Sequence, residues 1–127
     1  MINLKCLIDY KIINSDQNIV RNNIECDYNN NNEISFKDES DSIKITINND
    51  NIIMIKDDLS SKTTLNFILN KKTDSEYYIK LLNTTIDLKV LTNVLEISKN
   101  KIYIEYEIWF DLEYSGKFIY EMNIKEM

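Results

Sequence analysis

The chain has 127 residues, 43% hydrophobic and 28% charged, an ordinary balance for one folded domain. Its formal net charge of −6 argues against general binding of nucleic acid, which needs a basic surface. Histidine is absent, so we expect no zinc site, no Ser-His-Asp triad and no Cys-His dyad. We expect one acidic domain spanning residues 1–127.

Apolar residues alternate with polar ones through most of the chain, and a period of two is typical of β-strands. The alternating stretches are residues 2–12, 20–28, 34–36, 43–47, 52–55, 65–69, 77–81 and 86–92, the last continuing or bending into 95–97. Asn-, Asp- and Ser-rich segments separate them, among them residues 14–16, 29–32, 38–41, 48–51 and 70–74. Asparagine tolerates left-handed backbone, so these segments are predicted turns.

The clearest pattern runs from residue 101 to residue 125 and predicts a β-hairpin. One face carries Ile102, Ile104, Tyr106, Ile108, Phe110 and Leu112, and the other carries Tyr103, Glu105, Glu107, Trp109, Asp111 and Glu113. Residues 114–117 hold the only glycine, Gly116, and are the predicted turn. Phe118, Tyr120, Met122 and Ile124 then resume the apolar face.

Eight to ten short strands at even spacing, joined by turns, indicate an all-β barrel or sandwich. Consecutive hairpins without a long connection favour a closed, mostly antiparallel, up-and-down β-barrel. Closure also removes the exposed strand edges that would make this chain prone to aggregation.

Several packing motifs recur in order along the C-terminal two thirds. They are Leu65-x-Phe67, a polar turn before Tyr77-Tyr78, Ile86-x-Leu88-x-Val90-x-Thr92-x-x-Leu95, Tyr106-x-Ile108-x-Phe110 and Gly116. This pattern resembles a bacterial family of unknown function, the YwiB-like β-barrel proteins, whose fold is related to the calycins. The family tends to have glycine before the strand at residue 86, where this chain has Asn83-Thr84. The resemblance implies a calycin-like barrel and carries no catalytic residues.

Two cysteines, Cys6 and Cys26, each occupy an apolar position of a predicted strand. We predict that both are buried, reduced and unreactive, with a bridge as the alternative. The N-terminal residues lack the apolar segment of a signal peptide, and no run of 18 apolar residues exists. We therefore expect a cytoplasmic protein that does not bind membranes.

Charged residues offer few candidate sites. Asp38, Glu39 and Asp41 could hold calcium, but the spacing of a calcium-binding loop is absent, which favours a solvated acidic loop. Glu105, Glu107, Asp111 and Glu113 could serve acid-base chemistry, but they lie opposite the apolar face, which favours solvent exposure. We expect no catalytic, cofactor-binding or metal-binding residues.

Arg21 is the only arginine of the chain. An internal arginine can bind a ligand carboxylate in a small barrel. The neighbours Val20 and Ile24 are assigned to the core, so Arg21 is predicted to point outward, towards Glu25.

Trp109 and Tyr103 are the candidate interface residues, because a tryptophan among acids on a polar strand face is uncommon. We hypothesise that this face forms a symmetric homodimer. The alternative is a local cluster in which Trp109 contacts Tyr120 or Lys117 after a bulge.

Function is predicted only coarsely. The leading interpretation is a non-catalytic barrel that binds a small apolar ligand in its interior or a protein partner. The alternative is an enzyme that uses glutamate and tyrosine. An internal cavity would favour the binding module, whereas a surface cleft joining acids to Tyr78 or Tyr103 would favour the enzyme.

Overall fold

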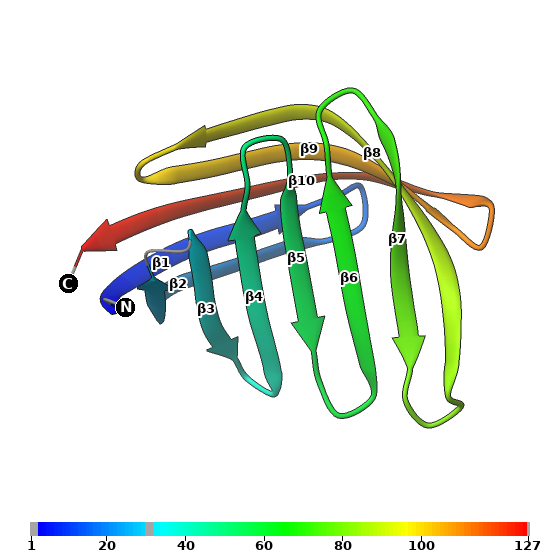
Figure 1. The fold of residues 1–127 in the computed structure, drawn as a ribbon, viewed down its shortest axis with the longest axis horizontal. Helices are drawn as coiled ribbons and strands as arrows, with labels where there is room; N and C mark the ends of the chain where they lie inside the picture. The colour runs from blue at the N-terminus through cyan, green and yellow to red at the C-terminus, as the bar shows by residue number, and fades with distance from the viewer. Residues whose placement is uncertain (1–2, 30–31, 127) are drawn as a thin grey trace.

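The computed structural model describes residues 3–29 and 32–126, and these form a closed barrel of ten strands (Figure 1). The strands are β1 (Asn3–Ile13), β2 (Asn18–Asn29), β3 (Glu33–Asp38), β4 (Asp41–Ile47), β5 (Ile52–Asp57), β6 (Ser61–Phe67), β7 (Lys72–Ile79), β8 (Thr84–Ser98), β9 (Lys101–Phe110) and β10 (Glu113–Glu126). Each strand pairs antiparallel with the next, and β1 pairs with β10. The predicted all-β, up-and-down barrel is confirmed. Ile2, Asn30 and Asn31, which the sequence places in a strand and a loop, lie outside the described residues.

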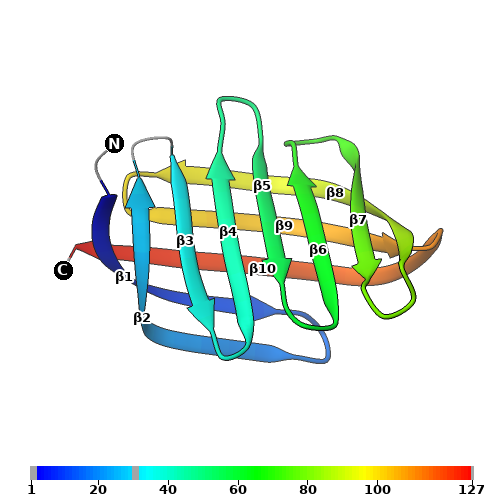
Figure 2. The ribbon, with the colours of Figure 1, turned by 60° about the horizontal axis from the view of Figure 1, so that its bottom comes forward.

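The barrel is flattened into two layers. Figures 1 and 2 show β3 to β7 running across the direction of β8, β9, β10 and β1. Inward side chains of both layers meet between them and fill the interior. Those that are fully buried are Ile8, Ile34, Ile45, Ile52, Phe67, Val90, Thr92, Ile102, Ile104 and Met122.

The turn of the last hairpin differs from its prediction. Phe110 pairs with Glu113, so the turn is the two-residue loop Asp111-Leu112, whose φ angles of 49° and 73° match the primed turns of hairpins. Gly116, predicted in the turn, instead follows a bulge in β10 and has a φ of 140°. Leu112, predicted to face the core, is 81% exposed because it is a turn residue.

A bulge in β2 changes which residues face the core. Ile8 pairs with Ile24, but Tyr10 pairs with Arg21, so β2 contains one more residue than β1 between these two pairs. Asn23 has a φ of 56°, the left-handed conformation that such a bulge uses. Arg21 consequently lies on the inward side of β2, opposite the buried Tyr10, and its predicted outward direction is wrong.

The two cysteines form a disulfide. Cys6 and Cys26 are directly opposite each other on β1 and β2, with their Cα atoms 5.2 Å apart, well within the range of a disulfide. Both are buried, as predicted. The prediction of reduced thiols is wrong, because it treated each strand separately, whereas the register of β1 with β2 brings the two sulfurs together.

Strands β6 and β7 separate beyond their paired residues, and we call this place the β6/β7 corner. They pair from Ser61 to Thr64, and side chains then replace the backbone ladder. Asn66 N donates to Ser75 Oγ at 3.0 Å, and Thr73 Oγ1 donates to Asn66 O. Thr73 and Ser75 are buried, so this corner is closed by hydroxyl groups.

No helix in the described part of the chain is long and apolar enough to cross a membrane.

Candidate functional site

Strands β2 and β3 also separate, at the β2/β3 corner. Their pairing covers Cys26–Asn29 of β2 and residues 33–36 of β3. Before Cys26, β2 follows β1 away from β3, as the bend of β2 in Figure 2 shows. Lys37 and Asp38 of β3 therefore have no partner on β2 in the described ladder.

An ion pair spans this corner. Arg21 Nε donates to Asp38 Oδ2 at 3.1 Å, and the Tyr10 hydroxyl donates to the same oxygen. Burial, and then the Asp38 carboxylate, raises the pKa of Tyr10 well above its ordinary value, so the phenol stays protonated. The predicted pairing of Arg21 with Glu25 is wrong, because the bulge turns Arg21 to the inward side.

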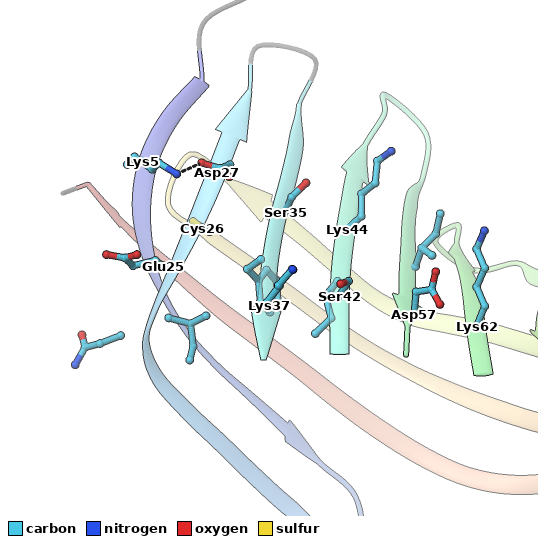
Figure 3. Close-up of a pocket in the computed structure, with 15 residues that line it drawn as sticks. Lys5, Glu25, Cys26, Asp27, Ser35, Lys37, Ser42, Lys44, Asp57 and Lys62 are labelled. Atoms are coloured by element: carbon cyan, nitrogen blue, oxygen red, sulfur yellow. Dashed lines mark ion pairs between the residues drawn. The ribbon is translucent and has the colours of Figure 1, made fainter. Parts of the chain in front are cut away.

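A hollow of about 850 Å³ lies on the outer surface of β2 to β6 and reaches into the β2/β3 corner (Figure 3). Two kinds of side chain line it. The apolar ones are Ile24, Cys26, Phe36, Ile43 and Ile55, and the polar ones are Lys5, Asn23, Glu25, Asp27, Ser35, Lys37, Ser42, Lys44, Asp57 and Lys62. Ile55 and the lysines of β3 and β4 face outward, whereas Cys26, Phe36 and Ile43 are core residues that border the hollow with less than a tenth of their surface exposed.

The acids and lysines of the hollow are unequally paired. Lys5 Nζ lies 2.7 Å from Asp27, and a hydrogen bond and the charge of that carboxylate raise the pKa of Lys5. Asp57 is held by Lys80 at 2.6 Å, from outside the hollow. Lys37 and Lys62 form no ion pair with any described carboxylate. The hollow therefore contains cations without acidic partners.

The structure separates the two predicted interface residues. Lys72 Nζ lies 3.9 Å from the centre of the Trp109 ring, and Tyr114 packs edge-on against that ring at 5.3 Å. Trp109 thus belongs to a local cluster, although its partners are neither Tyr120 nor Lys117. Tyr103 is six residues away on β9, about 20 Å along a strand. The homodimer stays a prediction, which sedimentation equilibrium of wild type and Trp109→Ala would test.

The other predicted candidates form no common site. Among the described residues no group of three acids or cysteines could hold a metal ion. The Glu107 carboxylate accepts hydrogen bonds from Asn93 at 3.0 Å and from Tyr114 at 2.9 Å. The Tyr78 hydroxyl donates to Asn83 at 2.5 Å, and neither Tyr78 nor Tyr103 lines the hollow.

Sequence reasoning missed the residues of the hollow. Lys37 and Lys44 alternate with core residues, as Lys89 does on β8. Nothing local distinguishes them, because only the strand register places them side by side. The one available signal was the Asn22-Asn23 pair, which interrupts the alternation of β2.

Comparison with known proteins now identifies the family. The model of a domain of unknown function (DUF1934) matches residues 8–125. The chain belongs to this family. A crystal structure of the ywiB protein from Bacillus subtilis is similar to this DUF1934 domain, with a TM-score of 0.64 and 10% identity over 98% of this chain and 92% of that one. At this identity the likeness concerns the fold alone. A search of curated proteins finds no match.

Proposed function

We propose that this protein is a non-catalytic binding module whose ligand occupies the hollow at the β2/β3 corner. The observation that carries the proposal is the lining of the hollow, where apolar residues such as Ile24 and Ile55 and lysines without an ion pair border one surface. Ligand sites in proteins commonly combine an apolar wall with a few polar groups that orient the ligand.

The packing of the barrel interior favours a ligand site on the outer surface over one inside the barrel. The inward positions carry large side chains with no exposed surface, such as Phe67, Ile104 and Met122. Phe67 packs against Tyr106 with ring centres 4.9 Å apart, which places aromatic rings in the middle of the barrel. A ligand at the β2/β3 corner needs no displacement of these residues.

Binding of a neutral apolar dye, N-phenyl-1-naphthylamine, tests the proposal. We expect a saturable rise in its fluorescence with the wild-type protein. Ser35→Arg places a bulky side chain in the middle of the hollow, on an outer face where the core is untouched, and should weaken the binding at least about tenfold, the loss expected when a ligand group is displaced.

Thr85→Arg is the matched control, because Thr85 is exposed on β8 and does not line the hollow. It should bind the dye like wild type. Equal binding by the two variants, or no binding by the folded wild type, would overturn the proposal.

A further inference from the structure

We propose that the ligand of the hollow carries an anionic group, bound between β3 and β4 by Lys37, Lys44, Ser35 and Ser42. This inference rests on the proposed function and specifies the chemistry of the ligand. Its class is an amphipathic anion, with a carboxylate, phosphate or sulfonate joined to an apolar body.

The register of β3 with β4 alternates lysine and serine on the outer surface. Ser35 pairs with Lys44, and Lys37 pairs with Ser42. Paired residues on adjacent strands are about 5 Å apart, and residues two apart on one strand are about 7 Å apart. Two ammonium groups and two hydroxyl groups therefore come from one small square of the sheet, and Figure 3 shows these four side chains beside one another.

All four side chains have hydrogen-bond donors available. No hydrogen bond within the described chain engages the hydroxyl of Ser35 or of Ser42 or the ammonium of Lys37. Lys44 Nζ lies 3.4 Å from Glu33, in a pair that is half exposed on the lysine side and can rearrange in solvent. Anionic oxygens accept hydrogen bonds from both ammonium and hydroxyl groups.

The charge of the hollow favours an anion in spite of the acidic chain. Its lining contains four lysines, Lys5, Lys37, Lys44 and Lys62, and three acids, Glu25, Asp27 and Asp57. Asp27 is paired with Lys5, Asp57 with Lys80 and Lys44 with Glu33, which leaves Lys37 and Lys62 against the single acid Glu25. The hollow thus has a small surplus of positive charge in a protein of net charge −6, which favours an anionic ligand over a cationic one.

Apolar contacts flank the square on both sides. Ile55 lies beside Lys44 on β5, and Ile24 lies towards the β2/β3 corner. An anion held at the square can rest an apolar body against either flank. A small inorganic anion would leave these flanks unused, so the expected ligand is amphipathic.

The test uses 8-anilinonaphthalene-1-sulfonate, an aromatic anion, beside the neutral N-phenyl-1-naphthylamine. The double variant Lys37→Gln/Lys44→Gln should bind the anionic dye at least about tenfold more weakly than wild type, since hydrogen bonds to charged groups are lost. It should bind the neutral dye within about twofold of wild type, because the volume of the hollow is kept. Raised salt should weaken binding of the anionic dye only.

Lys71→Gln/Lys99→Gln is the matched control, since it removes the same charge from exposed positions outside the hollow. It should bind both dyes like wild type. Equal loss of the anionic dye in both double variants would overturn the anion site. If the neutral dye binds at the hollow and the anionic dye ignores Lys37 and Lys44, the inference fails while the proposed function stands. If neither dye binds, both fail.

Discussion

The β6/β7 and β2/β3 corners of the barrel differ in the side chains that replace the missing strand pairing. At each corner two neighbouring strands pair over only part of their length. The β6/β7 corner is closed by the buried hydroxyls of Thr73 and Ser75, which bond the free backbone of Asn66. At the β2/β3 corner the ion pair between Arg21 and Asp38 spans the two strands.

The difference indicates how this barrel forms a hollow on its outer surface. At the β6/β7 corner, short hydroxyl side chains satisfy backbone groups that the strand ladder leaves unpaired. The Arg21–Asp38 ion pair at the other corner stays partly hydrated, with the Arg21 side chain 37% exposed. The hollow reaches into the β2/β3 corner, where the two strands are no longer paired.

Alkaline pH is expected to have the largest effect on stability. Burial raises the pKa of Tyr10, Tyr106 and Tyr120, whereas the hydroxyls of the β6/β7 corner do not titrate. A raised folded pKa means that the unfolded chain loses its protons first, so this stability is complete below about pH 10 and falls above it. With three tyrosines the free energy of unfolding should fall by about 4 kcal/mol per pH unit above about pH 11.

Urea unfolding at several pH values, followed by circular dichroism, measures this slope. Tyr10→Phe should reduce it by about 1.4 kcal/mol per pH unit, the contribution of one group. A slope that is unchanged in the variant would show that Tyr10 titrates normally and that the β2/β3 corner is wet around its hydroxyl.

Reduction of the disulfide should have the next largest effect. Cys26 is the first residue of β2 that pairs with β3, so the bridge to Cys6 holds β2 where its pairing with β3 begins. The cysteines are 20 residues apart, and opening a loop of that size should lower the free energy of unfolding by about 3 kcal/mol. Urea unfolding with and without dithiothreitol measures the loss, and Cys6→Ser/Cys26→Ser should not respond to the reductant.

The state of the cysteines can also be counted directly. Two free thiols in protein purified and denatured without reductant would contradict the bridge. Disulfides persist mainly in oxidising compartments, so thiol trapping in intact cells would also test the predicted cytoplasmic location.

Removal of a hydroxyl from the β6/β7 corner should cost less than the disulfide. Ser75→Ala leaves the N–H of the half-buried Asn66 without its acceptor, which should lower the free energy of unfolding by about 1–3 kcal/mol. Urea unfolding gives the value. Ser115→Ala, at an exposed position, should change it by less than about 0.5 kcal/mol.

The smallest effect is expected for the Arg21–Asp38 ion pair of the β2/β3 corner. Arg21→Gln removes an ion pair whose arginine is more than a third exposed, so solvent screening limits the loss to about 1 kcal/mol or less. The same urea experiment measures it. A loss larger than that of Ser75→Ala would reverse the comparison, because the ion pair would then hold the barrel closed more firmly than the hydroxyls do.

The alternation of apolar residues was sufficient to predict the strands and the closed barrel. It succeeded because a half-buried strand has a period of two that is visible in the chain itself. The asparagine turns followed for a similar local reason, and Asn70 and Asn83 adopt φ angles of 62° and 48°. Core positions such as Ile104, Tyr120 and Met122 were therefore predicted correctly.

The tertiary structure decided the features that depend on register. One extra residue at Asn23 reverses the inward and outward sides of the first half of β2, and alternation alone cannot show where such a bulge lies. The pairing of Cys6 with Cys26, the Arg21–Asp38 ion pair and the square of lysines and serines on β3 and β4 all follow from how strands align. Local sequence determines which residues can lie in a strand, and only the pairing of strands determines which side chains meet.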